Sequence, residues 1–283
     1  MLDFLVGLTF SFLIAFVAYK KASLNKSGCI AATVIGTGLY YFGGLWFSII
    51  MVAFFVSSSI LTKFKNYNKE GLDKLNEKSG NRDYIQVFAN GGVGLIFAII
   101  YYFSESPVVL LAYAVSFAEA NADTWASEIG VLSKSKPISI LNFKPLEKGM
   151  SGGISILGTT FAFLGASFTS CIYFIASLIT YKDIKQSFIY SILCILIGFI
   201  GSIVDSILGA SMQAQYYCED LKIVTEKKEY KGKPNKLIKG ITFINNDVVN
   251  LSSNLISALM VLLIVWFYTI TASNVIIINL YWN

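Results

Sequence analysis

Long apolar segments, separated by short lysine-rich segments, fill most of this 283-residue sequence and constrain its fold more than any other feature. Hydrophobic residues make up 55% of the chain and charged residues only 14%. Soluble domains carry about 25% charged residues, so this chain cannot cover its surface with side chains that face water. The sequence therefore predicts a protein embedded in a lipid bilayer.

Eight of these segments are candidates for membrane spans, each of which needs about 20 mostly apolar residues. The run 28–62 is too long for one span, and Gly43-Gly44 divides it into two helices. The other expected spans cover 2–19, 84–103, 108–132, 154–180, 188–212 and 248–270. The apolar tail 273–283 is too short to cross and is expected to lie at the membrane interface. The predicted fold is all-α, a polytopic transmembrane helix bundle that forms a single domain over 1–283.

The positions of the Lys and Arg residues provide an independent test of this topology. With the N-terminus outside, the inner loops are 20–27, 63–83, 133–149 and about 214–243, and they hold 20 of the 22 cations. Because Lys and Arg concentrate in cytoplasmic loops, we predict an N-out, C-out protein in the cell membrane of a prokaryote. The same lysines attract anionic lipid headgroups, and no nucleic-acid-binding motif accompanies them, so lipids rather than nucleic acids are the expected partners.

Histidine is absent from the sequence, which excludes several kinds of catalytic site. A Ser-His-Asp triad, a Cys-His dyad and a His-ligated zinc site all require it. The four cysteines are isolated, without the spacing of a metal knuckle or a disulfide framework. Any chemistry must therefore use carboxylates, amides, hydroxyls, lysines and a bound metal ion.

Acidic residues inside or at the ends of apolar segments are the main functional signal, since each costs about 2.5–3.5 kcal/mol at mid-bilayer on insertion scales. They are Glu119, Asp123, Glu128, Asp205 and Asp247. In the predicted topology the last four gather near the cytosolic ends of three helices, and Glu119 lies one turn deeper. Glycines at helical spacing flank Asp205, which lets another helix approach closely. Such acids could share Mg²⁺, which prefers oxygen ligands; a lock of interhelical hydrogen bonds is the alternative.

A segment rich in Gly and Ser, 144–155 (KPLEKGMSGGIS), leads into the expected span 154–180. Backbone N–H groups at a helix start suit phosphate, and Lys144 and Lys148 add positive charge. The segment 86–92 (QVFANGG) offers a weaker version of the same arrangement. A simple turn with tight packing is the alternative for both segments.

Several motifs resemble those of one integral membrane family. The segment 121–130 (NADTWASEIG) is similar to the N/G-D-T-W-A-S-E-x-G signature of the family that includes phytyl-phosphate kinase of plants and cyanobacteria and transmembrane protein 19. Segments 86–92, 151–159 (SGGISILGT), 201–210 (GSIVDSILGA) and 245–253 (NNDVVNLSS) resemble further motifs of this family in the same order. The pattern also looks distantly like that of dolichol kinases and CDP-diacylglycerol synthases.

The resemblance implies an Mg²⁺-dependent kinase that transfers a phosphoryl group from a nucleoside triphosphate, CTP in the first place, to a prenyl monophosphate. The active site would face the cytosol, and Asp123, Glu128 and Asp205 would be the catalytic and metal-binding residues. The expected substrate-binding and nucleotide-binding residues are Asn90, Asn121, Thr124, Ser127, Lys144, Lys148, Ser151, Gly152, Gly153, Ser155, Asn246 and Asn250. Met150-Ser151 replaces the Thr-Asn that is usual in the family, so no role of that Asn is carried over. The roles of Glu119 and Asp247 stay open, as does assembly into a homo-oligomer.

Three other functions remain open at this stage. A prenol or dolichol-type kinase would need a base for the hydroxyl group, and a cytidylyltransferase acting on a lipid phosphate would release pyrophosphate. A transporter of an anionic metabolite is the third, because transporters use broken helices and inverted repeats. The interrupted stretch 28–62 favours a transporter, but no motif occurs twice and the polar residues stop on one side of the membrane.

Overall fold

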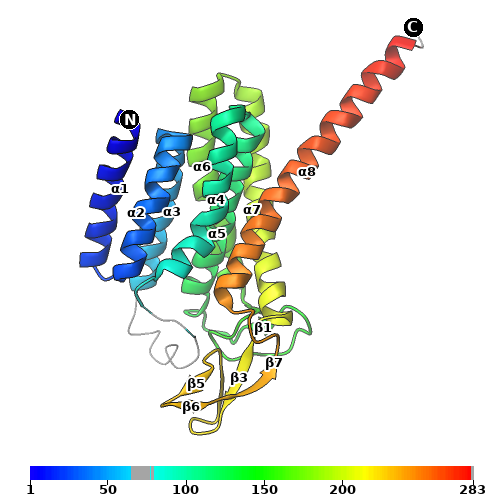
Figure 1. Cartoon of the computed structure of the whole chain (residues 1–283). Coiled ribbons are helices and arrows are strands. Elements are labelled where there is room, and N and C mark those ends of the chain that lie inside the picture. The colour runs from blue at the N-terminus through cyan, green and yellow to red at the C-terminus, as the bar shows by residue number, and fades with distance from the viewer. Residues whose placement is uncertain (65–76, 78–79, 282–283) are drawn as a thin grey trace.

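The computed structural model describes residues 1–64, 77 and 80–281, and these are mostly helical (Figure 1). The helices of this described part are α1 (Leu2–Lys20), α2 (Lys26–Gly43), α3 (Leu45–Lys63), α4 (Tyr84–Ser104), α5 (Pro107–Gly130), α6 (Ile156–Tyr181), α7 (Ile184–Ser211) and α8 (Asn246–Tyr281). The predicted break at Gly43-Gly44 is confirmed. Gly44 separates α2 from α3 with φ of +78°, a conformation that glycine adopts without steric cost.

Six helices in the described residues are long and apolar enough to cross a membrane. They are α1, α3, α4, α6, α7 and the part of α8 up to Thr271. The remaining two, α2 and α5, run alongside the others in the bundle (Figure 1), but α2 is rich in Gly and Thr and α5 carries three acids. The chain is therefore a polytopic helical membrane protein, while the count of eight spans and the N-out orientation stay predictions.

The helix that carries most of the acidic residues, α5, lies at the centre of the bundle. It packs against α3, α4, α6, α7 and α8, and every residue from 110 to 122 is buried. The edge helix α1, by contrast, packs mainly on α2 and buries only Gly7, Ala15 and Ala18. The acids of α5 are thus shielded from lipid by five neighbouring helices.

The prediction of an all-α fold is wrong at one end of the molecule, where several short strands form. Strands β3 (Gln215–Cys218), β4 (Ile223–Thr225) and β7 (Lys236–Lys239) make an antiparallel sheet in the order β4-β3-β7, β5 (Glu229–Tyr230) pairs with β6 (Lys233–Pro234), and β1 (Ile138–Ser139) pairs with β2 (Gly153–Ile154). Lys231 and Gly232 connect β5 to β6 with φ of +50° and +78°. Two positive φ values in a two-residue connection are typical of a tight hairpin turn.

These strands lie at the end of the bundle opposite both termini (Figure 1). We call this end the lysine-rich end and define it by residues 20–27, 131–155 and 212–245. The expected loop 63–83 falls largely outside the described residues. The tail 273–283 does not form a separate interfacial segment, because α8 continues through Tyr281; Figure 1 shows that this part of the helix extends away from the bundle.

Candidate active site

A cavity of about 300 Å³, here called the polar cavity, lies at the lysine-rich end between α5, α6, α7, the start of α8 and the segment 148–155. It collects most of the residues that the sequence singles out: Asp123, Ser127, Glu128, Lys148, Ser151, Gly152, Gly153, Ser155, Asp205, Asn246 and Asp247. Residues from four separate motifs therefore meet in one place, as the sequence predicts for a site built at helix ends.

Asp123 of α5 and Asp205 of α7 line this cavity, and a third acid, Glu119 of α5, interacts with both. Asp205 accepts a hydrogen bond from Ser253 Oγ at 2.9 Å. The hydrogen-bond network orients the Asn250 amide so that Nδ2 donates to Asp205 Oδ2 at 3.2 Å and to the Asn246 carbonyl at 3.1 Å. Glu119 is only 1% exposed and lies within electrostatic reach of Asp123 and Asp205. Neither of its carboxylate oxygens has a hydrogen-bond partner in the described part of the chain.

These acids have the chemistry that a divalent cation requires. Among the described residues, no three Asp, Glu or Cys side chains form a ready-made ligand cluster. Mg²⁺ does not need such a cluster, since it takes one or two carboxylates and completes its shell with waters and substrate phosphates. Asp123 and Asp205 line the cavity, and buried Glu119, whose carboxylate oxygens have no partner among the described residues, lies within electrostatic reach of both. The donor set therefore fits Mg²⁺.

Glu128 lies in the same cavity but has different neighbours. Its Oε1 accepts a hydrogen bond from Thr62 Oγ1 at 2.7 Å, which ties α5 to the end of α3. It also lies close enough to Arg82 for the two charges to interact. The shared role of Asp123, Glu128 and Asp205 in binding one metal thus stays a prediction.

The segment expected to form a phosphate-binding helix start has a different local structure. The prediction that Ser151–Gly153 begin the helix is wrong, because Gly153 pairs in β2 and Ser155 is the N-cap of α6. The Ser155 Oγ accepts a hydrogen bond from the Gly158 N–H at 3.1 Å. Gly152, with φ of +76°, packs so closely on α7 that an added Cβ would lie 2.3 Å from the Ala210 Cβ. The turn is nevertheless part of the cavity wall.

Asn121, an expected substrate-binding residue, instead links three helices. Its side chain is fully buried and does not line the polar cavity. Oδ1 accepts from Ser57 Oγ at 3.1 Å, and Nδ2 donates to the Gly165 carbonyl at 3.1 Å and to Thr169 Oγ1 at 3.3 Å. Asn121 therefore joins α5 to α3 and α6.

Four other expected binding residues lie outside the lining of the polar cavity, and one of them, Asn250, contacts Asp205 as described above. Lys144 is exposed to solvent, and Thr124 Oγ1 donates to the Ala120 carbonyl of its own helix. Asn90 Nδ2 donates to the Gln86 carbonyl, and its side chain lines a second cavity. Of the predicted lysines, only Lys148 lines the polar cavity, where its Nζ donates to the Ser133 carbonyl.

Gln213 and Glu226 were not predicted, yet Glu226 lines the polar cavity and Gln213 connects it to Ser151, another lining residue. Gln213 accepts from Ser151 Oγ at 2.8 Å and donates to Glu226 Oε1 at 2.7 Å. Burial raises the pKa of Glu226 to about 7, although the hydrogen bonds from the Glu77 N–H and from Gln213 oppose this shift. Gln213 follows the α7 motif directly, but Glu226 carries no local sequence signal.

Arg82 is the second omission and the sole arginine of the chain. Its Nη1 donates to Ser59 Oγ at 3.0 Å, and its guanidinium lies 5.7 Å from the centre of the Phe55 ring. Burial lowers the pKa of the guanidinium, and the nearby Glu128 carboxylate raises it. The presence of one arginine among 22 cations is the signal that could have identified it.

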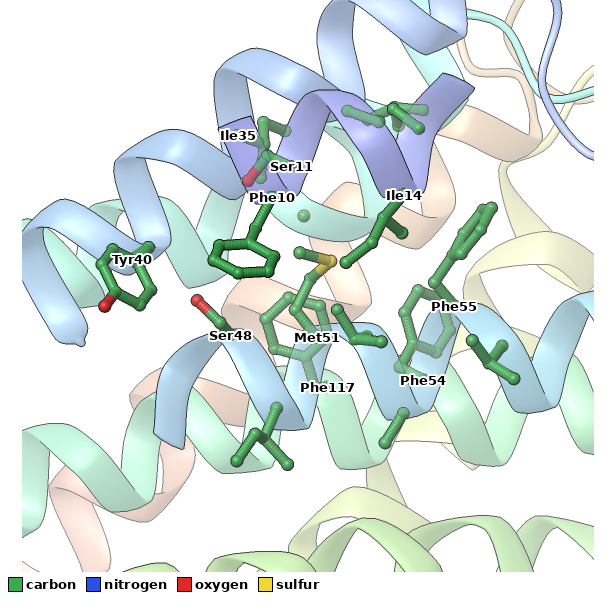
Figure 2. Close-up of a pocket in the computed structure, with 18 of the residues that line it drawn as sticks. Phe10, Ser11, Ile14, Ile35, Tyr40, Ser48, Met51, Phe54, Phe55 and Phe117 are labelled. Atoms are coloured by element: carbon green, nitrogen blue, oxygen red, sulfur yellow. The ribbon is translucent and has the colours of Figure 1, made fainter. Parts of the chain in front are cut away.

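A second cavity, here called the apolar cavity, has a volume of about 650 Å³ and lies among α1, α2, α3 and α4 (Figure 2). Phe10, Met51, Phe54 and Phe117 are among its mostly hydrophobic lining residues. Gln86 lines both cavities, so the two are neighbours at the lysine-rich end.

Comparison with known proteins places this architecture in a family. The profile described as "Integral membrane protein DUF92" matches residues 9–258. The chain belongs to the DUF92 family of integral membrane proteins. This membership confirms the family resemblance that the sequence motifs indicate.

Proteins similar to this chain come from a plant and an archaeon, among other organisms. Protein PGR of Arabidopsis thaliana is 31% identical over 88% of this chain and 91% of its own length. The uncharacterized membrane protein MJ0933 of Methanocaldococcus jannaschii is 32% identical over 70% of this chain and 78% of its own. Protein VTE6, chloroplastic, of Arabidopsis thaliana is 25% identical over 80% of this chain and 61% of its own length. No solved structure matches the chain.

Proposed function

We propose that this DUF92 protein is a membrane kinase that transfers the γ-phosphoryl group of a nucleoside triphosphate to a prenyl monophosphate. CTP is the donor that we expect. The observation that carries the proposal is the composition of the polar cavity. Carboxylates of α5 and α7, Lys148 and the Gly-rich segment 149–153 all line this cavity. Acids that can bind a metal, together with cationic and backbone N–H donors, are the parts that phosphoryl transfer requires. The likeness of the motifs to those of prenyl-phosphate kinases supports the same reaction.

Each group has a defined task in this proposal. Asp123 and Asp205 would hold Mg²⁺, which when bound neutralises charge on the phosphates. Ser253 and Asn250 fix the orientation of the Asp205 carboxylate through their hydrogen bonds. Lys148 and the N–H groups of the turn before β2 bind phosphate oxygens.

The chemical step needs no general base. An oxygen of the prenyl monophosphate, already ionised near neutral pH, attacks the γ-phosphorus of the nucleotide. A new P–O bond forms, the bond from the γ-phosphorus to the β–γ bridging oxygen breaks, and the nucleoside diphosphate leaves. A site without histidine can perform this reaction, because catalysis consists mainly of positioning and charge stabilisation.

The test uses the purified protein in detergent with Mg²⁺, a prenyl monophosphate and, in turn, CTP, ATP, GTP and UTP. The proposal expects the prenyl diphosphate and a nucleoside diphosphate in equal amounts with at least one nucleotide. It fails if no nucleotide yields the diphosphate. Release of pyrophosphate would instead identify a cytidylyltransferase, phosphorylation of a free prenol would identify an alcohol kinase, and anion flux into proteoliposomes without turnover would identify a transporter.

A further inference from the structure

The apolar cavity has the dimensions of a site for a lipid tail. Its volume of about 650 Å³ falls within the roughly 300–1,000 Å³ that is typical of pockets for small ligands. Figure 2 shows Phe10 and Ile14 of α1 facing Met51 of α3, with Phe117 of α5 behind them. Residues of five helices, α1 to α5, therefore line this cavity.

The polar side chains of this cavity are distributed unevenly along it. Its charged and amide side chains, Arg82, Gln86 and Asn90, belong to the start of α4 and the residues before it, at the lysine-rich end. The walls further into the bundle are apolar apart from hydroxyl groups. Such a gradient suits a molecule with an ionised head and a hydrocarbon tail.

The length of the cavity also suits such a molecule. On α3 the lining residues run from Leu45 to Val56, which corresponds to about 17 Å at a rise of 1.5 Å per residue. One leaflet of a bilayer contributes about 15 Å, half of the hydrocarbon thickness of roughly 30 Å. Because Leu45 begins α3 at the end opposite the lysine-rich end, a tail whose head group lies at Arg82 would reach along the cavity beyond the middle of the bilayer.

We propose that the apolar cavity holds the hydrocarbon tail of a lipid monophosphate whose phosphate lies at Arg82 and Gln86. The identity of the head group rests on the proposed function. A guanidinium can bind two phosphate oxygens at once, and Ser59 and Phe55 hold that of Arg82 in place. Because Gln86 also lines the polar cavity, a phosphate at this position would lie where the two cavities meet.

A cross-linking experiment tests tail binding without requiring turnover. The purified protein is irradiated with a prenyl monophosphate that carries a benzophenone at the far end of its tail, and the labelled peptides are mapped by mass spectrometry. We expect labels on the faces of α1 and α3 that line the cavity, near Phe10 and Met51, and at least a tenfold reduction by excess geranylgeranyl monophosphate. Labels confined to the outer surface would overturn the proposal. So would equal labelling by a diazirine phosphatidylcholine that geranylgeranyl monophosphate does not displace.

Cavity-filling variants provide the second arm. Ala53→Phe places a ring in the cavity wall, whereas Ile60→Phe makes a similar change on the same helix at a position that is 61% exposed and outside the lining. We expect Ala53→Phe to raise KM for geranylgeranyl monophosphate about tenfold relative to geranyl monophosphate, and Ile60→Phe to leave this ratio unchanged. Equal ratios in both variants would contradict the proposal.

The two arms also separate this proposal from the proposed function. Cavity labelling without any kinase product would refute the kinase and retain the tail site. Kinase product without cavity labelling would refute the tail site and retain the kinase.

Discussion

The polar and apolar cavities share one bundle but differ in the properties that select a ligand. The polar cavity is the smaller, about 300 Å³ against 650 Å³, and acids, a lysine and backbone groups form much of its wall. The apolar cavity is formed mainly by α1 to α4, and the polar one mainly by α5 to α8 and the strands and loops beside them. The first half of the chain therefore suits a hydrocarbon, and the second half suits phosphate chemistry.

The helix α5 connects the two cavities, because Phe117 lines the apolar one and Asp123 lines the polar one. Burial of a charged group is costly unless other polar groups or a metal compensate for it. Acids are found where α5 is surrounded by five helices, whereas the exposed edge helix α1 faces lipid with apolar side chains. Substitutions in the apolar cavity should therefore change KM for the lipid substrate and leave KM for the nucleotide unchanged.

The largest effect is expected from removal of a carboxylate in the polar cavity. Asp205→Asn should lower kcat/KM by at least about a hundredfold, the scale seen when one electrostatic group of an active site is lost. Asp183→Asn is the matched control at the far end of α7, where Asp183 caps the helix by accepting from the Gln186 N–H at 2.9 Å. Since Asn caps as well as Asp, this control should retain activity. Normal kinetics in Asp205→Asn would show that the polar cavity is not catalytic.

A smaller and more selective effect is expected at the boundary between the cavities. Arg82→Lys retains the charge but loses the planar fork that binds two oxygens. We expect KM for the lipid monophosphate to rise about tenfold, or about 1.4 kcal/mol, while KM for the nucleotide stays constant. Steady-state kinetics with each substrate varied in turn measure both values. An equal rise in the KM values of both substrates would mean that Arg82 stabilises the fold and does not bind the lipid phosphate.

The pH dependence of nucleotide binding should reveal Glu226. Its pKa of about 7 means that the carboxyl group is neutral below pH 7 and ionised above it. Ionisation adds a negative charge to a cavity that holds Asp123, Asp205, Asp247 and Lys148, so KM for the nucleotide should rise about threefold between about pH 6 and about pH 8. Glu226→Gln should remove this part of the rise. The same slope in both proteins would exclude Glu226 as its source.

The same group gives a prediction for stability. The pKa of Glu226 is higher in the folded protein than the value of about 4.3 in an unfolded chain. The folded state therefore binds the proton more tightly, and its contribution to stability is complete below about pH 4 and is lost as the pH rises through 7. Thermal unfolding of Glu226→Gln should lack this contribution. An identical pH dependence of Tm in the two proteins would contradict the assignment.

The smallest effect on catalysis is expected at Asn121. Asn121→Ala removes hydrogen bonds that join α5 to α3 and α6, so it should lower the free energy of unfolding by about 1 kcal/mol and leave both KM values unchanged. Thr124→Val is the control, because the Thr124 hydroxyl donates to the Ala120 carbonyl within its own helix. A selective rise in KM for one substrate in Asn121→Ala would restore Asn121 as a binding residue.

The helices were predictable from the sequence because the length of each apolar segment, and the glycines that interrupt it, indicate where a helix begins and ends. The division at Gly43-Gly44 and the clustering of Asp123, Asp205 and Asp247 follow from hydropathy and alternating helix direction. The strands at the lysine-rich end were missed because each is only two to four residues long, too short to show a clear alternation of apolar and polar side chains. The Lys231-Gly232 pair was the available signal, since two positive φ values mark a tight hairpin.

The candidate site was predictable only in part. Sequence motifs identify which residues occur together, but they do not separate binding from packing. Asn121 and Asp123 occupy one motif, yet Asn121 bonds to neighbouring helices while Asp123 lines the cavity. Glu226 reaches the site through the fold of the strands, which no local pattern indicates. The apolar cavity depends on how α1 and α3 are spaced, and that spacing is a property of packing.

The most direct test of phosphoryl transfer in the polar cavity uses two preparations of the nucleotide, one labelled at the γ-phosphorus and one at the α-phosphorus. The measurement is which product carries each label. With the nucleotide that supports turnover, the γ label should appear in the prenyl diphosphate and the α label should remain in the nucleoside diphosphate. Asp205→Asn should abolish the transfer. Appearance of the α label in the lipid, with release of pyrophosphate, would contradict the kinase mechanism, as would the absence of any labelled lipid.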